Sequence, residues 1–189
     1  MRKVILFNMM TLDGFFEGPG RSLDWHNVDA EFNTFAIDQL EAADMLMFGR
    51  VTYEMMAAYW PTPAAMGDDP VVAEKMNTIP KLVFSRTLAQ AEWSHTRLVK
   101  TDAAAEVSKQ KEQSGKDILI FGSARLAATL TAPGLIDEYR VIINPVILGG
   151  GTPLFQGIHQ KLNLKLLQAR TFGSGNVLLY YRPAPASAA

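Results

Sequence analysis

Residues 117–130, DILIFGSARLAATL, pass from an apolar run directly into a helical pattern, with only Gly122 and Ser123 at the corner. A short, continuous apolar run is typical of a strand that is buried on both faces of a sheet. The small corner has two explanations. It allows close packing, or it leaves room for a negatively charged group at the helix N-terminus, where backbone N–H groups are free to bind it.

Outward from this corner, strands and helices are predicted to alternate along most of the chain. Helices are expected after caps at Asp29 and Asp102, over 51–59, and from the corner to Pro133. Residues 62–80 are expected to be irregular with some helical character. The expected strands are 3–9, 45–48, 81–85, 96–100, 117–121, 138–147, 164–171 and 177–182.

This order of elements predicts the architecture. Strands that alternate with helices favour a parallel sheet, and the last two strands, joined by a turn at 173–175, form a hairpin. Pro145 within the strand 138–147 indicates an edge or a bulge. We expect an α/β three-layer sandwich with a mainly parallel central sheet and an antiparallel C-terminal hairpin. Residues 1–183 are expected to form a single domain, and 184–189 a disordered tail.

Composition excludes several classes of function. With 189 residues and 48% hydrophobic content the chain can bury one core, and its net charge of −1 provides no basic field for nucleic acid. No segment approaches the length of a membrane span. Because cysteine is absent, thiol catalysis and thiolate metal sites are excluded, and a cytoplasmic location is expected. The three histidines lack metal-ligand spacing, so no metal is predicted.

Three corners share one design, at 48–52, 84–87 and 121–125. Each has a small or hydroxyl residue at the end of a strand and an arginine nearby, before an expected helix. A phosphate at such a corner gains helix N–H donors and charge-assisted hydrogen bonds from the arginine. Each corner alone is also an ordinary turn. Three at one sheet edge favour phosphate binding, although neither GxGxxG nor a Walker A loop is present.

Two loops are further candidates for a ligand site. The segment 11–24 is rich in Gly, Pro and Asp, and loops of this length are often functional. Asp13 either caps its own backbone or points into the site, and Trp25 either covers a planar ligand or seals the sheet. The glycines at 149–151 let the backbone approach a ligand closely, or they form a flexible turn.

Six segments together carry a family resemblance. They are TLDGFFEGPG (11–20), LMFGRVTYE (46–54), KLVFSRTL (81–88), DILIFGSARLAATL (117–130), GLIDEYRVIINPVILGGGTPLF (134–155) and SGNVLLYYRP (174–183). They resemble the dihydrofolate reductase-like fold and, within it, the reductase domain of the bifunctional riboflavin-biosynthesis deaminase-reductase. The stand-alone bacterial branch, usually called dihydrofolate reductase family proteins, is the most similar, and the resemblance covers nearly everything up to about residue 183.

The resemblance implies NADPH as the cofactor and a homodimer as the assembly. The implied cofactor residues are Arg50 and Thr52 at the phosphates, Ser85, Arg86 and Thr87 at the 2′-phosphate, Gly122, Ser123, Ala124, Arg125 and Leu126 around the pyrophosphate, and the pair Gly149 and Gly150. The loop 11–25 would lie over the nicotinamide and the substrate. Trp25, Phe48 and Asp24 are candidates for substrate binding, and Asp13 and Asp29 are candidates for proton donation, with water as the alternative.

The implied activity is hydride transfer to a small pterin- or pyrimidine-like heterocycle, or to a carbonyl or imine. It resembles the reaction of 5-amino-6-(5-phosphoribosylamino)uracil reductase in riboflavin biosynthesis. Two positions depart from the pattern, since Asn33 stands where dihydrofolate reductases carry a carboxylate and Phe121 where riboflavin-type reductases carry an acid. The alternative is therefore a non-catalytic protein that binds a nucleotide or other ligand and has kept the fold.

Overall fold

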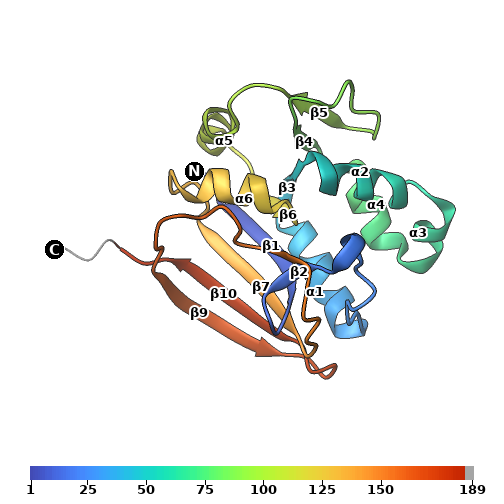
Figure 1. Ribbon diagram of the computed structural model, residues 1–189. Coiled ribbons are helices and arrows are strands. Elements are labelled where there is room, and N and C mark those ends of the chain that lie inside the picture. The colour runs from blue at the N-terminus through green and yellow to red at the C-terminus, as the bar shows by residue number, and fades with distance from the viewer. Residues whose placement is uncertain (186–189) are drawn as a thin grey trace.

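The computed structural model describes residues 1–185 (Figure 1). Its main sheet is built from β1 (Val4–Thr11), β3 (Ala43–Gly49), β4 (Lys81–Phe84), β5 (Thr96–Val99), β6 (Asp117–Phe121), β7 (Glu138–Asn144), β9 (Leu164–Thr171) and β10 (Val177–Pro183). The spatial order is β5-β4-β3-β6-β1-β7-β10-β9. The first six of these strands pair in parallel, and β10 pairs antiparallel with both β7 and β9. The predicted sheet and C-terminal hairpin are confirmed.

Helices cover both faces of the sheet (Figure 1). They are α1 (Ala30–Glu41), α2 (Arg50–Tyr59), α3 (Pro63–Asp68), α4 (Pro70–Thr78), α5 (Ala103–Glu112) and α6 (Ala124–Thr131). Side chains of α1, α2 and α4 share a core with β3 and β4, whereas those of α5 and α6 share a core with the other face of β1 and β6. The predicted three-layer sandwich is therefore confirmed.

Helix boundaries follow from local chemistry. The Asp29 carboxylate accepts a hydrogen bond from the N–H of Phe32 (2.8 Å), and the Asp102 carboxylate accepts one from Ala104 (2.8 Å). Each bond satisfies a free donor in the first turn of its helix. Both predicted caps are confirmed.

Three local predictions were wrong in part. Residues 62–80 form α3 and α4, each with a capping side chain followed by a proline in the first turn. The strand β7 ends at Asn144, so Pro145 lies beyond it and not within a bulge. The loop 11–24 contains a short strand, β2 (Phe15–Glu17), and a 3-10 turn, η1 (Pro19–Arg21). Residues 184–189 were expected to form a tail. Within it, the N–H of Ala184 donates to the carbonyl of Asn163 (2.8 Å), and residues 186–189 lie outside the described residues.

One buried charge has no carboxylate partner among the described residues. Lys81 begins β4 and is 1% exposed, and its ammonium donates to the carbonyls of Asn77 (3.2 Å) and Ile79 (2.7 Å) at the end of α4. The ammonium also lies 4.6 Å from the centroid of the Trp93 ring. The carbonyls at a helix C-terminus attract a cation, but burial dominates and lowers the pKa of Lys81 to about 8.

This lowered pKa predicts a pH dependence of stability. Between pH 8 and the ordinary lysine value of 10.5, the unfolded chain holds a proton at Lys81 that the folded chain has released. The free energy of unfolding should therefore rise with pH over this window, by at most about 3 kcal/mol. In Lys81→Met the rise should disappear, whereas Lys100→Met, at an exposed lysine, should keep it. Denaturant titrations at several pH values test this, and equal slopes for Lys81→Met and the wild type would contradict it.

Candidate functional site

Two of the predicted corners meet at the C-terminal edge of the sheet, because β3 and β6 are neighbouring strands. The N–H of Ser123 donates to the Thr52 hydroxyl (3.1 Å), and the N–H of Gly49 donates to the Ser123 hydroxyl (2.9 Å). The Ser123 hydroxyl in turn donates to the carbonyl of Phe121 (2.8 Å). The start of α2 and the start of α6 are thus hydrogen-bonded to each other and form one structural unit.

The backbone of this unit is held in an unusual conformation. Gly122 and Ser123 have φ values of +55° and +63°, so two successive residues lie in the left-handed region. A Cβ atom on Gly122 would lie 2.9 Å from the Thr52 hydroxyl oxygen. Only glycine fits there, and the strain is stored where the strand turns into the helix.

The helices that begin at this corner lack side-chain caps. The side chains of Asp29, Thr62, Asp69 and Asp102 cap α1, α3, α4 and α5, respectively. By contrast, Gly49 before α2 has no side chain, and the Ser123 hydroxyl before α6 points back to β6. The first-turn N–H groups of α2 and α6 therefore have no side-chain acceptor among the described residues. Two adjacent helix N-termini of this kind can bind the oxygens of a phosphate or pyrophosphate.

The three predicted arginines differ in their surroundings. Arg50 forms an i,i+4 ion pair with Glu54 (2.9 Å) on the surface of α2. Arg86 and Arg125 are exposed and form no ion pair within residues 1–185. These two side chains are consequently available to an anionic ligand.

The third corner is not a strand-to-helix corner, so that prediction was wrong. After β4 the chain runs without a helix to β5, and the Ser85 hydroxyl accepts hydrogen bonds from the N–H groups of Thr87 (3.2 Å) and Leu88 (2.9 Å). Phe84 pairs with Gly49 across β3 and β4. The turn 85–87 therefore adjoins the corner at Gly49 even without a helix of its own.

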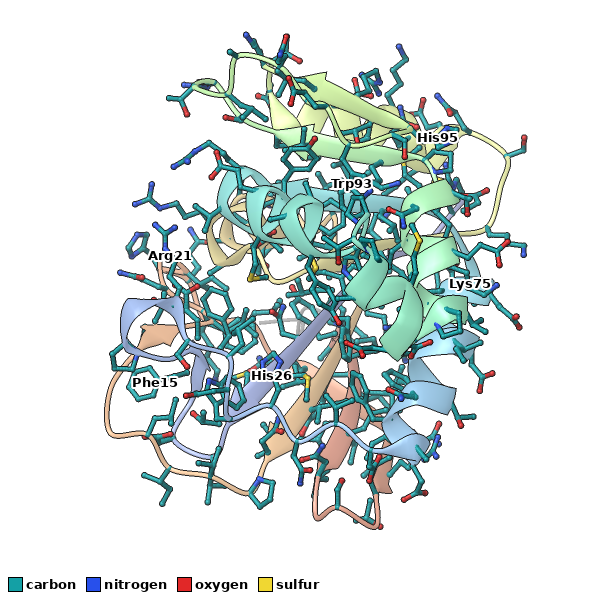
Figure 2. The ribbon with its side chains drawn as sticks, turned by 90° about the vertical axis from the view of Figure 1, so that its right-hand side faces the viewer. Phe15, Arg21, His26, Lys75, Trp93 and His95 are labelled. Atoms are coloured by element: carbon teal, nitrogen blue, oxygen red, sulfur yellow. The ribbon has the colours of Figure 1, made fainter. Side chains whose placement is uncertain are left out.

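Two loops at the same edge are joined. β2 pairs with β8 (Thr152–Pro153), and the Thr152 hydroxyl donates to the Glu17 carboxylate (2.7 Å). The Asp13 carboxylate accepts the N–H groups of Gly149 (2.7 Å) and Leu148 (3.3 Å). Figure 2 shows Phe15 and Arg21 at the two ends of the β2–η1 segment. Gly150 follows Gly149, and a Cβ added to either glycine would meet no atom within 4 Å.

The candidate proton donors already have backbone partners. Hydrogen bonds from the Thr11 hydroxyl and from the N–H groups of Gly149 and Leu148 lower the pKa of Asp13. The N–H of Phe32 is the main cause that lowers the pKa of Asp29. Both groups are therefore ionised carboxylates with structural hydrogen bonds at neutral pH, which does not favour proton donation.

The three candidate substrate contacts lie in different environments. Phe48 is fully buried between the rings of Phe121 and Trp93, with centroids 6.2 and 5.9 Å away, so it cannot contact a substrate and that prediction was wrong. Asp24 is exposed and accepts a hydrogen bond from the Ser22 hydroxyl. Trp25 is partly buried, and its indole N–H donates to the Ser22 carbonyl (3.2 Å).

Sequence reasoning missed a buried polar cluster beneath the loop. The N–H of Asn27 donates to the side-chain oxygen of Asn144 (3.0 Å), and the Asn176 amide donates to the carbonyl of Asn27 (2.6 Å). His26, which precedes Asn27 in the chain (Figure 2), packs edge-on against Trp25 with ring centroids 4.4 Å apart, and burial lowers its pKa to about 4. The only signal in the sequence was an asparagine at the end of the apolar strand VIIN.

A separate cavity lies at the opposite edge of the sheet. It measures about 630 Å³ and is lined by the starts of β4 and β5, with Lys81, Trp93 and Arg97. Figure 2 shows Trp93 and His95 on the side of the molecule away from Phe15. The Lys81 ammonium is already bonded to two carbonyls, and Arg97 forms an ion pair with Glu106. These two cations of the cavity therefore have partners within the fold, unlike Arg86 and Arg125 at the C-terminal edge, which form no ion pair within residues 1–185.

No three His, Asp or Glu side chains within residues 1–185 are placed to hold a metal ion. Over the same residues, no helix combines the length and the apolar character that crossing a membrane requires.

Comparisons with known proteins identify the family and the fold. The chain is 35% identical over 180 residues to the uncharacterized protein YyaP of Bacillus subtilis. The alignment covers 95% of this chain and 94% of that relative. A putative riboflavin biosynthesis protein from Shewanella sp. PV-4 superimposes with a TM-score of 0.71 at 24% identity, over 96% of this chain and 99% of that one.

A dihydrofolate reductase from Enterococcus faecalis, solved with NADP(H), superimposes with a TM-score of 0.64 at 14% identity, over 96% of each chain. This similarity concerns the fold alone. The model of the RibD C-terminal domain family matches residues 2–178. The chain therefore belongs to the RibD C-terminal domain family and has the dihydrofolate reductase-like fold.

Proposed function

We propose that this protein is an NADPH-dependent reductase that transfers a hydride to a small pterin- or pyrimidine-like heterocycle, or to a carbonyl or imine. The observation that carries the proposal is the pair of uncapped helix N-termini at Gly49 and Ser123, with Arg86 and Arg125 unpaired in the described chain. Membership of a reductase family supports it, as does the NADP(H) complex of the dihydrofolate reductase with this fold. The reaction would resemble that of 5-amino-6-(5-phosphoribosylamino)uracil reductase, in the cytoplasm.

The residues present fit the cofactor. The N–H groups of Ala124, Arg125 and Leu126 would bind the pyrophosphate at the start of α6, and Gly122 keeps side-chain atoms out of this corner. Arg86, with the Ser85–Thr87 turn, would bind the 2′-phosphate, because a guanidinium forms two parallel hydrogen bonds with phosphate oxygens. When bound, NADPH supplies the hydride from its nicotinamide ring.

The remaining tasks of the chain are positioning and the exclusion of water. The joined loops of β2 and β8 would cover the nicotinamide and the substrate, with Trp25 and Asp24 facing the substrate. Proton donation by Asp13 or Asp29 stays a prediction from the sequence. Because both carboxylates accept backbone N–H groups, we propose that water supplies the proton that accompanies the hydride.

A direct titration of the protein with NADPH and, separately, with NADH tests the proposal. Calorimetry should give micromolar binding of NADPH and at least about tenfold weaker binding of NADH, since only NADPH carries the 2′-phosphate. A protein that binds neither nucleotide would refute the proposed function.

A second candidate is a non-catalytic protein that binds the nucleotide. The structural hydrogen bonds of Asp13 and Asp29, together with Asn33 in α1 in place of an acid, favour it. Oxidation of bound NADPH with a panel of pterins, pyrimidines and simple carbonyl compounds distinguishes the two. Tight binding of NADPH without turnover of any compound would support the second candidate.

We also propose a homodimer formed through β9, the outer strand of the sheet (Figure 1). Leu164, Leu166 and Leu167 are 37%, 49% and 48% exposed, and an open apolar edge strand favours pairing with another chain. Leu166→Asp should therefore weaken the dimer by about 30-fold or more, as a charge at the centre of an apolar interface does. Val71→Asp, at an exposed apolar side chain of α4, should leave it intact. Sedimentation of the wild type as a monomer would contradict the proposal.

A further inference from the structure

The strongest unexplained contact lies between the two loops at the C-terminal edge. Asp13 lies two residues beyond the end of β1. Its two carboxylate oxygens accept hydrogen bonds from the N–H groups of Leu148 and Gly149, which are more than 130 residues away in the chain. Gly149 has a φ of +71°, a backbone conformation that favours glycine. Charge-assisted hydrogen bonds of this kind are stronger than neutral ones, and they hold one loop against the other.

A second set of contacts joins the same loops. The N–H of Leu12 donates to the carbonyl of Val146 (2.9 Å), and the Glu17 carboxylate accepts the Thr152 hydroxyl (2.7 Å). Gly151 lies so close to β2 that a Cβ atom on it would collide with the carbonyl oxygen of Glu17. The segments 12–17 and 146–153 are therefore joined at several separate positions.

These joined loops rest on the candidate phosphate corner. Phe16 of β2 and Leu154, just after β8, pack with Ala124 at the first position of α6, in one cluster with Met10. A displacement of either loop would therefore disturb a hydrophobic cluster that includes the first residue of α6. This cluster links the loops that Asp13 joins to the start of the helix.

We propose that Asp13 is a positioning residue, and not a proton donor, which fastens the glycine loop 148–151 to the β2 loop so that both cover the bound nucleotide as one unit. The inference rests on the proposed function as far as the nucleotide is concerned, but the fastening itself does not. Hydrogen bonds from the Thr11 hydroxyl and the Leu148 and Gly149 amides lower the pKa of Asp13, which agrees with a carboxylate that stays ionised.

Hydrogen exchange tests the fastening without any nucleotide. Asp13→Ala should speed the exchange of amides 146–152, in the loop to which Asp13 does not belong, as well as that of 12–17. Asp102→Ala is the matched control, because this exposed aspartate also accepts two backbone N–H groups, of Ala104 and Ala105, at the start of α5. Unchanged exchange at 146–152 in Asp13→Ala would overturn the proposal.

Titration with NADPH tests the positioning. Asp13→Ala should weaken NADPH binding by about fivefold, because the covering conformation is populated for a smaller fraction of the time. Gly151→Ala, which pushes the same two loops apart, should weaken NADPH binding by a similar factor. In the double variant the loss of affinity should be smaller than the product of the two single losses. NADPH affinity equal to the wild type in Asp13→Ala would refute positioning. A wild type without NADPH affinity would refute the proposed function. Hydrogen exchange of amides 146–152 would then be the only test of whether Asp13 holds the two loops together.

Discussion

Gly122→Ala is expected to weaken NADPH binding by about 10- to 100-fold. At a φ of +55° an alanine costs about 1–2 kcal/mol relative to glycine. Its Cβ would also lie 2.9 Å from the Thr52 hydroxyl oxygen, which accepts the N–H of Ser123. Relief of this contact must move α2 or α6, and either movement separates the helix N-termini that would hold the phosphates. Calorimetric titration of the variant measures the loss.

The matched control is Gly134→Ala, beyond the opposite end of α6. Gly134 has a φ of +70°, so the backbone penalty is similar, but no atom lies within 4 Å of the added Cβ. Gly134→Ala should lose about 1–2 kcal/mol of stability and Gly122→Ala at least as much, but only Gly122→Ala should lose nucleotide affinity. Equal NADPH affinities for the two variants would show that the corner at Gly122 does not bind the nucleotide.

The parts of the fold that depend on local patterns could be predicted from the sequence. The apolar run 117–121 followed by small residues gave both the buried strand β6 and the sharp entry to α6. Asp29 and Asp102 were recognisable as caps because capping acts within three residues. The alternation of strands and helices was sufficient for the parallel sheet.

Errors arose where the effect of a proline depends on its position in the element. Residues 62–80 were predicted to be irregular with some helical character, yet Pro63 and Pro70 each occupy the first turn of a helix, where the missing N–H has no cost. Val146 and Ile147 continue the apolar pattern of β7, but Pro145 cannot donate to the ladder, and the strand ends before it. Both cases are decided by backbone hydrogen bonding, which hydrophobicity does not report.

The candidate site was predictable only in part, because its contacts connect distant segments. Phe48 was a plausible substrate contact from its place before the corner, but a strand buried on both faces leaves neither side open. The bond between Asn27 and Asn144 spans 117 residues, and that between Asp13 and Gly149 spans 136. No local pattern indicates such pairs. The sequence therefore identified which segments meet at the edge, and not which side chains are already engaged there.

Arg86 and Arg125 should divide the recognition of the nucleotide between them. Arg125→Ala is expected to weaken NADPH and NADH binding alike, by about 10- to 50-fold, because the pyrophosphate at the start of α6 is common to both. Arg86→Ala should weaken NADPH binding by a similar factor and leave NADH binding unchanged, because only NADPH carries the 2′-phosphate. Titration of each variant with both nucleotides measures the two effects.

The prediction is decisive because the two variants are expected to change NADPH and NADH affinity in different ways. Arg86 follows β4 and Arg125 lies in the first turn of α6, so the two side chains approach a ligand from different strands of one sheet edge. Arg97→Ala removes an arginine from the opposite edge, where it pairs with Glu106, and should alter neither affinity. If Arg86→Ala weakened both nucleotides equally, the turn 85–87 would contact the shared part of the molecule. If neither variant changed the affinity for NADPH or NADH, the phosphates would bind elsewhere. The corner between α2 and α6 would then serve only to pack the two helices together.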